Sequence, residues 1–245
     1  MNIPPPKRFL ELIRQYRITY RNWYDVMFSI FINRAQISCV LNNGQRITLD
    51  PKEAVLLAGL NVISLDIDTL IFNYKGRRMI IKGWKYGYPG DSFSDYVRLN
   101  VNDKRVLDVG ASIGDSPIYF SLAGAKEIVA VEVDKKRVEL MRENLRINGI
   151  NNVMVIDKGV GTSDTENQVS YFTLVKDYGP FDVAKIDCDG CERALIKYVK
   201  EIPELLIEWD YTYNDLVYQL RRNGYKVMNE YALYNTLGFL HAWRE

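Results

Sequence analysis

The sequence predicts two regions, an N-terminal α+β region over residues 1–90 and an α/β domain with a mostly parallel sheet over residues 91–245. The α/β class follows from short apolar segments that alternate with helical patterns from residue 105 onward, which is typical of parallel strands covered by helices. The last two apolar segments have no helix between them, so we expect these two strands to pair antiparallel.

The composition is that of a soluble globular protein. Apolar residues make up 47% and charged residues 26% of the 245 residues, a balance that excludes a disordered chain. Lys and Arg number 32 against 31 Asp and Glu, so no global field attracts nucleic acid, although local patches remain open. No apolar run reaches the roughly 18 residues of a membrane span, and residues 1–7 lack the apolar stretch of a secretory signal. We therefore expect a cytoplasmic protein.

The N-terminal region mixes helices and hairpin strands. Residues 9–31 carry apolar side chains at helical spacing and predict one or two helices. Residues 36–50 alternate apolar and polar side chains around Asn43-Gly44, which predicts a β-hairpin. Residues 51–59 predict a short helix, with Asp50 as its N-cap.

Two further strands are expected before the boundary between the regions. We place one strand at residues 63–72 and the next at residues 78–82. Residues 84–95 are rich in glycine and aromatic side chains, so we expect an irregular connection there.

The α/β domain is expected to contain a seven-stranded sheet. We place its strands at residues 105–109, 127–132, 152–156, 181–187, 204–210, 225–229 and 237–243. We place its helices from residue 114 onward, and at residues 135–148, 190–200 and 212–223. In such sheets, ligands bind at the carboxyl ends of the strands.

The segment from Val106 to Gly114 is a buried strand that enters a glycine-bearing turn and then a helix. Gly110 and Gly114 let the backbone pass close to a ligand, and the free N–H groups of the turn suit a ligand carboxylate. The spacing Asp-x-Gly-x-x-x-Gly differs from the Gly-x-Gly-x-x-Gly that a dinucleotide pyrophosphate requires. It favours a methionine moiety. Asp108 can accept a hydrogen bond from the ammonium group of that moiety.

Acidic residues end the next two strands. Glu132 stands 22 residues after Gly110, where a carboxylate accepts hydrogen bonds from both ribose hydroxyls. Asp157 ends the third strand and can bond the adenine amino group. Together these positions predict an S-adenosylmethionine site, although turn capping and solvated strand ends remain the structural alternative. The expected cofactor-binding residues are Asp108, Gly110, Ala111, Gly114, Asp115, Glu132, Val133, Asp157, Lys158 and Asp187.

The residues from about 92 to 210 resemble the FkbM-type methyltransferases, whose members methylate hydroxyl groups on sugars and other natural products. The resemblance rests on Tyr96 and on residues 106–116, 144–148 and 185–192. The last block is similar to the family signature Lys-Ile-Asp-x-Glu-Gly-x-Glu, from which this chain departs at Asp189.

The resemblance implies a class I methyltransferase, with a Rossmann-like sheet and S-adenosylmethionine as cofactor. It also implies that Asp187, Asp189 and Glu192 face the transfer site. A hydroxyl acceptor loses its proton as it attacks, and three carboxylates this close in sequence raise the pKa of one of them, which makes a base. The alternative is that Glu192 satisfies a helix dipole and Asp189 caps that helix.

Other polar residues have less defined roles. Glu208, near the end of the fifth strand, reaches the substrate or is an ordinary strand end. Lys185 is a candidate for a buried ion pair. Cys188 and Cys191 form a Cys-x-x-Cys pair, but the chain lacks a second pair for a four-ligand zinc site. We expect no metal, and we interpret the two cysteines as small, partly buried side chains, with a redox disulfide as the alternative.

The leading hypothesis is an S-adenosylmethionine-dependent O-methyltransferase that acts on a small-molecule or glycan acceptor. The N-terminal region then serves acceptor recognition or a homodimer contact. The alternatives are an RNA or protein methyltransferase and a non-catalytic binding module that retains the fold. An RNA acceptor requires the N-terminal Arg and aromatic residues to form one exposed face. These residues are Arg8, Arg14, Arg17, Arg21, Arg34, Tyr16, Tyr20, Trp23 and Tyr24.

Overall fold

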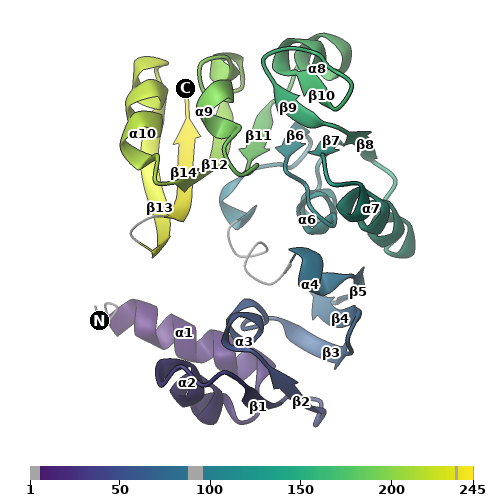
Figure 1. Ribbon diagram of the computed structural model, residues 1–245, viewed down its shortest axis with the longest axis vertical. Coiled ribbons are helices and arrows are strands. Elements are labelled where there is room, and N and C mark those ends of the chain that lie inside the picture. The colour runs from purple at the N-terminus through teal and green to yellow at the C-terminus, as the bar shows by residue number, and fades with distance from the viewer. Residues whose placement is uncertain (1–5, 88–95, 235–236, 245) are drawn as a thin grey trace. The chain divides into compact units, whose positions relative to one another are not determined.

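The computed structural model describes residues 6–87, 96–234 and 237–244 of the chain. The chain divides into two compact units, Met1–Ser94 and Asp95–Glu245, which we call the N-terminal unit and the C-terminal unit. Figure 1 shows the elements of each.

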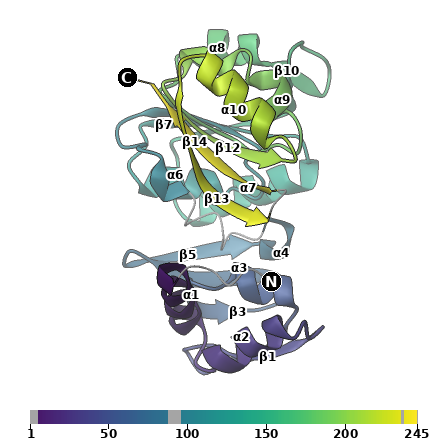
Figure 2. The ribbon, with the colours of Figure 1, turned by 90° about the vertical axis from the view of Figure 1, so that its left-hand side faces the viewer.

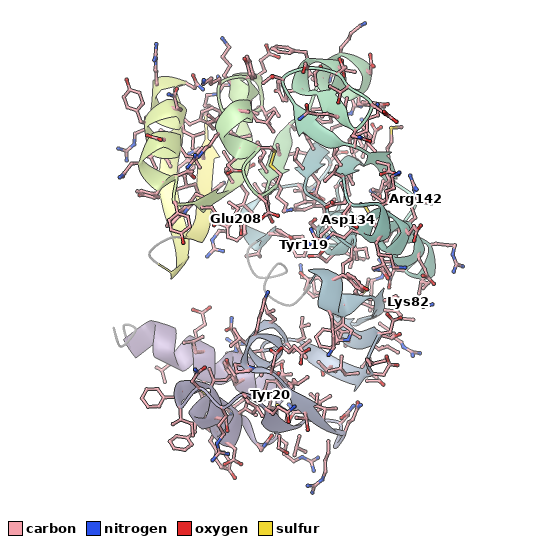
Figure 3. The ribbon with its side chains drawn as sticks, viewed as in Figure 1. Tyr20, Lys82, Tyr119, Asp134, Arg142 and Glu208 are labelled. Carbon is pink, nitrogen blue, oxygen red and sulfur yellow. A yellow bond between two sulfur atoms is a disulfide. The ribbon has the colours of Figure 1, made fainter. Side chains whose placement is uncertain are left out.

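The N-terminal unit begins with the two helices that the sequence predicts, α1 (Pro6–Thr19) and α2 (Trp23–Phe31). The predicted hairpin is confirmed as the antiparallel pair β1 (Ile37–Val40) and β2 (Arg46–Leu49). Tyr20, whose side chain is buried (Figure 3), donates its hydroxyl to the Ala54 carbonyl. This unit therefore has a core of its own.

The third helix, α3 (Pro51–Leu56), confirms the predicted N-cap. The Asp50 side chain accepts from the Glu53 N–H, and the Glu53 side chain accepts from the Asp50 N–H. This reciprocal pair is a capping box, which satisfies two helix-end donors.

The single strand predicted at residues 63–72 is wrong, because the chain reverses within it. The structure has β3 (Asn61–Leu65), β4 (Thr69–Tyr74) and β5 (Arg77–Lys82) in one antiparallel sheet. At the reversal, the Asp66 carboxylate accepts from the N–H groups of the residues two and three positions later. Aspartate in this role forms a turn. The apolar residues on both sides of Asp66 made the segment resemble one continuous strand.

The connection that the sequence predicts at residues 84–95 begins instead as a short helix, α4 (Trp84–Gly87). Residues 88–95 lie outside the described residues.

The C-terminal unit contains the predicted seven-stranded sheet, in the order β13-β14-β12-β11-β6-β7-β8. Only β14 runs antiparallel to its neighbours, and the other pairs of this sheet are parallel. The strands are β6 (Arg105–Val109), β7 (Glu127–Glu132), β8 (Val153–Asp157), β11 (Val183–Ile186), β12 (Glu204–Asp210), β13 (Lys226–Tyr234) and β14 (Leu237–Trp243). The predicted fold class is confirmed.

Helices cover both faces of this sheet. Figure 2 shows α8, α9 and α10 on one face and α6 and α7 on the other. Leu107 and Val109 belong to the core beneath α8 to α10, so the residue between them, Asp108, points to the opposite face. The helices are α6 (Asp115–Leu122), α7 (Lys135–Ile147), α8 (Tyr171–Tyr178), α9 (Glu192–Leu195) and α10 (Tyr213–Arg222).

Several short elements differ from the sequence prediction. Two three-residue strands, β9 (Gly159–Gly161) and β10 (Gln168–Ser170), and the helix α8 fill a segment that the sequence left unassigned. The helix predicted at residues 190–200 is broken into α9 and a 3-10 turn, η2 (Val199–Glu201). A second 3-10 turn, η1 (Tyr96–Arg98), precedes β6. Among the helices that the structure describes, none has the length and apolar character that a membrane crossing needs.

Candidate functional site

The parallel strands of the C-terminal unit bring the predicted acidic residues to one edge of the sheet. Glu132 of β7 is the register partner of Asp157 of β8. Val109 of β6, which precedes the glycine turn, pairs with Ile186 of β11, which precedes Asp187. Because parallel strands end on the same side, these side chains gather at one edge, where such sheets bind ligands.

The glycine turn packs directly against the chain that follows β11. Gly110 has φ +78°, and a Cβ at this position would lie 1.6 Å from the Asp187 carbonyl oxygen. Gly114 has φ +92°, and its Cβ would lie 2.8 Å from Met141 Cγ. The sequence predicts that both glycines make room for the approach of a ligand. The structure shows a different reason, because neighbouring protein atoms already exclude a side chain.

Glu132 ties this turn to the end of β7. Its side chain is 5% exposed, and Oε2 accepts from the Ser112 N–H at 2.9 Å. Oε1 accepts from the N–H groups of Val133 and Asp134, each at 2.9 Å. The alternative of a solvated strand end is therefore wrong for Glu132, since both oxygens hold backbone amides in place.

Besides Gly114 and Glu132, three further expected cofactor residues are buried in the protein. Asp108 is 0% exposed, and Ser116 donates its hydroxyl to Oδ2 at 2.6 Å. Ala111 and Asp115 are buried as well. Asp108 thus has no surface open to the ammonium group of a ligand, contrary to the sequence analysis. Its Oδ1 lies 3.3 Å from Lys185 Nζ, and burial raises the pKa of this carboxyl.

Three expected cofactor residues at or just after the ends of β7 and β8 are more accessible, namely Val133, Asp157 and Lys158. Val133 is 57% exposed, and Asp157 is exposed at the end of its strand. Lys158 is half-buried and donates from Nζ to the Thr165 carbonyl at 3.3 Å. These side chains can contact a ligand without rearrangement of the core.

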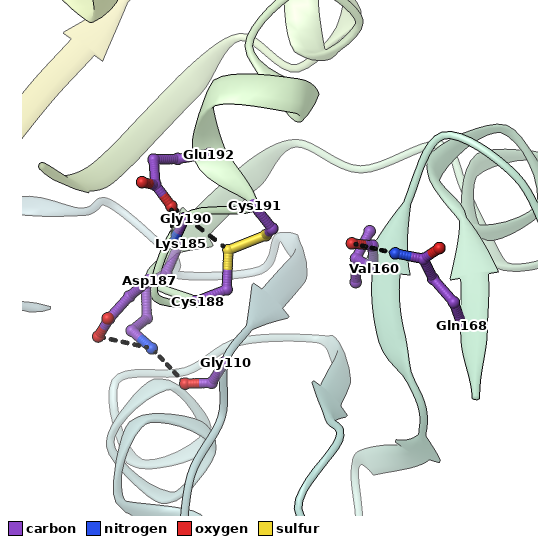
Figure 4. The surroundings of a disulfide bond; sticks show 9 residues. All are labelled: Gly110, Val160, Gln168, Lys185, Asp187, Cys188, Gly190, Cys191 and Glu192. Atoms are coloured by element: carbon purple, nitrogen blue, oxygen red, sulfur yellow. Dashed lines mark hydrogen bonds and ion pairs between the residues drawn. A yellow bond between two sulfur atoms is a disulfide. The ribbon is translucent and has the colours of Figure 1, made fainter. Parts of the chain in front are cut away.

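Lys185 is a buried cation at the centre of the site, as one reading of the sequence predicts. Its Nζ donates to the Gly110 carbonyl at 2.7 Å (Figure 4). The same atom lies 3.3 Å from Asp108 Oδ1 and 3.3 Å from Asp187 Oδ2. Although burial opposes the charge, these two carboxylates raise the pKa of Lys185 well above its usual value. Lys185 is therefore charged and links the glycine turn to the end of β11.

Two residues that carry the family resemblance support this centre. Tyr96 is 2% exposed, its ring centroid lies 5.9 Å from Lys185 Nζ, and its hydroxyl donates to Asp115 Oδ2 at 3.4 Å. Asn144 is 0% exposed and donates from Nδ2 to the Ile113 carbonyl at 2.9 Å. Both hold the turn from within the unit.

Asp187 and Glu208 form a carboxyl pair that the sequence analysis did not foresee. Burial, the hydrogen bond to Asp187 and the charge of Asp187 raise the pKa of Glu208 to about 10. Burial also raises the pKa of Asp187, but the charge of Lys185 and the hydrogen bond from Glu208 outweigh it, and the pKa lies below its usual value. At neutral pH, Glu208 is therefore protonated and donates a hydrogen bond to the charged Asp187.

The expectation of a raised pKa is wrong for Asp187, whose pKa is lowered. The raised pKa belongs to Glu208, on the adjacent strand β12. The sequence places Glu208 near a strand end. Its pairing with Asp187 could be predicted only with the knowledge that β12 lies beside β11. Asp187 has 29% of its side chain exposed and carries the negative charge of the pair.

The loop between β11 and α9 is closed by a disulfide between Cys188 and Cys191 (Figure 4). The interpretation of these cysteines as separate small side chains is therefore wrong. Glu192 is 4% exposed, and its Oε2 accepts from the Gly190 N–H at 2.9 Å. Asp189 is exposed with φ +53° and does not cap α9, whose N-cap is Cys191. Glu192 thus stabilises the loop, and Asp189 faces solvent.

The N-terminal arginine and aromatic residues do not form the single exposed face that an RNA acceptor would favour. Tyr16 and Tyr20 are 6% and 0% exposed. Both rings belong to the core of the N-terminal unit, so they cannot stack on bases.

Comparisons with known proteins cover parts of the chain. No family model matches it, so membership of the FkbM-type family stays an expectation. The chain is 28% identical over 100 residues to Uncharacterized protein 158B of Sulfolobus islandicus rod-shaped virus 1, covering 41% of this chain and 56% of that protein. It is 45% identical over 56 residues to the ribosomal protein L11 methyltransferase of Acetivibrio thermocellus, covering 23% of this chain and 18% of that protein. The chain thus spans little more than half of the first relative and less than a fifth of the second.

Solved structures match over a larger share of the chain. Fibrillarin from Aeropyrum pernix, in complex with S-adenosyl-L-methionine, has a TM-score of 0.50 at 14% identity and covers 85% of this chain and 94% of its own. A putative SAM-dependent methyltransferase from Streptococcus mutans has a TM-score of 0.53 at 12% identity, covering 74% and 57%. At these identities the likeness concerns the fold. With the strand order of the sheet, it shows that the C-terminal unit has the Rossmann-like class I methyltransferase fold.

Proposed function

We propose that this chain is an S-adenosylmethionine-dependent methyltransferase whose cofactor binds at the strand ends of the C-terminal unit. The observation that carries the proposal is the alignment of Glu132 with Asp157, beside a glycine turn, at the carboxyl edge of a sheet with this fold. That edge is where parallel α/β sheets bind nucleotides.

The proposed roles follow from the positions of the side chains at this edge. Asp157 accepts from the adenine amino group, while Val133 supplies an exposed apolar surface for the adenine ring. Glu132 accepts from the ribose hydroxyls by exchanging part of its backbone bonding. Asp187, charged and partly exposed, takes the role that the sequence analysis gave to Asp108 and accepts from the ammonium group. The cofactor supplies the methyl group from its sulfonium.

For the acceptor, we propose a hydroxyl of a small molecule or glycan, which rests on the resemblance to the FkbM-type family. Asp187 and Asp189 lie at the loop after β11, where the transfer would occur. The pKa of Asp187 lies below its usual value, which makes this carboxylate a weak base, so we do not assign proton removal to it.

A protein acceptor is the second candidate. Two relatives favour it by name, the ribosomal protein L11 methyltransferase and a protein arginine N-methyltransferase 1 of Oryza sativa, which is 39% identical over 57 residues. Incubation with S-adenosylmethionine that carries a labelled methyl group distinguishes the candidates. Label in small-molecule or glycan fractions supports the first, and label in protein supports the second.

The binding test is calorimetric titration of the protein with S-adenosylhomocysteine. We expect micromolar affinity, weakened in Asp157→Ala by about 1–3 kcal/mol, the range for removing a hydrogen-bond partner. Asp157 is exposed, so its loss leaves the core intact. Asp177→Ala, which removes an exposed aspartate from α8, serves as the matched control and should bind as the wild type does. Absence of heat and of any thermal shift would leave only a binding module with this fold.

A further inference from the structure

The disulfide lies directly beside the proposed cofactor edge. Cys188 follows Asp187 at the end of β11, and Cys191 is the N-cap of α9. Both cysteines are half-buried, and therefore partly open to solvent. Cys39 is the free cysteine of the chain, and it is buried in the N-terminal unit. A Cys-x-x-Cys pair with this exposure is suited to exchange with an external thiol.

The disulfide loop is mechanically tied to the glycine turn. A Cβ at Gly110 would lie 3.4 Å from Cys188 Cα and 1.6 Å from the Asp187 carbonyl oxygen. The Asp187 N–H donates to the Val109 carbonyl at 3.0 Å. Lys185 joins the two segments from inside, because its Nζ bonds the Gly110 carbonyl and pairs with Asp187. A shift of the loop therefore moves the turn.

The covalent ring also fixes an unusual backbone. Asp189 has φ +53° and Gly190 has φ +118°, so two consecutive residues have left-handed conformations, which are uncommon outside glycine. The Gly190 N–H is held by the buried Glu192 carboxylate at 2.9 Å. Opening of the sulfur–sulfur bond removes the covalent constraint on this backbone.

We propose that Cys188 and Cys191 form a reversible thiol–disulfide site, and that its reduction by an external dithiol weakens cofactor binding at the adjacent strand ends. The second clause rests on the proposed function, whereas the first does not. The loop after β11 is the element that transmits the change, since it carries both the disulfide and Asp187.

The reduction of the protein disulfide needs no reactant besides the dithiol. A thiolate of the dithiol attacks one protein sulfur, so the bond between Cys188 and Cys191 breaks and a mixed disulfide forms. The second thiol of the reductant then attacks the mixed disulfide and closes its own disulfide. Two electrons and two protons pass to the protein, whose two sulfurs become thiols.

The first experiment tests the exchange alone. The full-length protein is equilibrated with mixtures of reduced and oxidised dithiothreitol in the presence of a chelator, quenched with an alkylating agent and weighed by mass spectrometry. We expect two additional labels to appear together across a single transition under native conditions. Cys39→Ser, the matched control, should leave that transition unchanged. Labelling of both cysteines without reductant, or no labelling until the protein unfolds, would overturn the proposal.

The second experiment measures the coupling. Calorimetry with S-adenosylhomocysteine should show binding at least about 5-fold weaker to the reduced protein than to the oxidised protein, the low end of ordinary coupling between sites. By reciprocity, saturating S-adenosylhomocysteine should shift the dithiothreitol ratio at the midpoint by the same factor. The double variant Cys188→Ser with Cys191→Ser should bind like the reduced protein under both conditions.

The outcomes separate the two proposals. Equal affinity in both redox states, with an unshifted midpoint, would overturn the coupling and leave the methyltransferase proposal intact. Absence of binding in both states would contradict the methyltransferase proposal, and the labelling transition would still report on the disulfide. A double variant that binds like the oxidised wild type would also overturn the coupling.

Discussion

At the scale of single residues, the distribution of protons decides what the sheet edge can do. Lys185 is 1% exposed and pairs with two carboxylates. Asp187 is the more exposed of those two carboxylates, and it accepts a hydrogen bond from the protonated Glu208. Glu208 thus orients Asp187 without adding a second negative charge to the pair, and the charge of Asp187 can meet a cationic ligand.

The variant Glu208→Gln tests this arrangement through the pH dependence of stability. Glu208 has a pKa of about 10 in the folded protein against an ordinary 4.5, so the folded state retains a proton that the unfolded state has lost. The stability from Glu208 is complete below pH 4.5 and declines as the pH rises towards 10. Between pH 5.5 and 9.5, we expect the wild type to lose up to about 1.4 kcal/mol per pH unit relative to the variant.

Urea unfolding of both proteins across that range measures the difference. The lowered pKa of Asp187 does not interfere, because its contribution is lost only as the pH falls into the acid range. Parallel stability curves for the wild type and Glu208→Gln would show that Glu208 is already charged at neutral pH.

At the scale of elements, long patterned segments were predictable and short ones were not. The strand β12 (204–210) matches its prediction, because seven residues of strand between two helical patterns leave little ambiguity. The strands β9 and β10 have three residues each, which is too few to show an alternation of apolar and polar side chains. The turn at Asp66 was missed because it depends on one side chain that bonds its own backbone.

The candidate site divides in the same way. Strand ends that collect acidic residues follow from the order of elements, so Glu132 and Asp157 were found from the sequence. The pairing of Asp187 with Glu208 requires the order of strands in space. The disulfide requires the local path of a loop, and the burial of Asp108 requires knowledge of which face of β6 is covered. These are tertiary properties, and the spacing of residues does not encode them.

The glycine turn gives a test at this scale. Gly110→Ala places a methyl group 1.6 Å from a backbone oxygen. Because a backbone atom cannot move away as a flexible side chain can, we expect the loss of at least about 3 kcal/mol of stability or failure to fold. Gly149→Ala is the matched control, with φ +68° and nothing within 4 Å of the new Cβ. It should cost only about 1 kcal/mol, the penalty of a left-handed alanine. Thermal and urea unfolding compare the two, and equal costs would contradict the packing argument.

At the scale of the whole molecule, the division into two units separates two sets of properties. The C-terminal unit carries the sheet and every residue of the proposed site. The N-terminal unit carries an exposed aromatic face on α2, formed by Tyr24, Phe28 and Phe31, which are 60%, 58% and 66% exposed. Their spacing of four and three residues places them on one side of the helix. Exposed apolar patches of this kind mark interaction surfaces.

We expect this aromatic face to be the homodimer contact that the sequence analysis considered, because aromatic residues are enriched at the buried centres of protein interfaces. Light scattering during gel filtration should then give twice the chain mass of 28.4 kDa for the wild type and a single chain for Phe28→Asp. Phe172→Asp, which changes a 55% exposed phenylalanine of the C-terminal unit, should remain dimeric. If the wild type is monomeric and Phe28→Asp instead alters transfer to the acceptor at unchanged S-adenosylhomocysteine affinity, the face recognises the acceptor. A Phe28→Asp variant with the mass and the transfer activity of the wild type would contradict both roles.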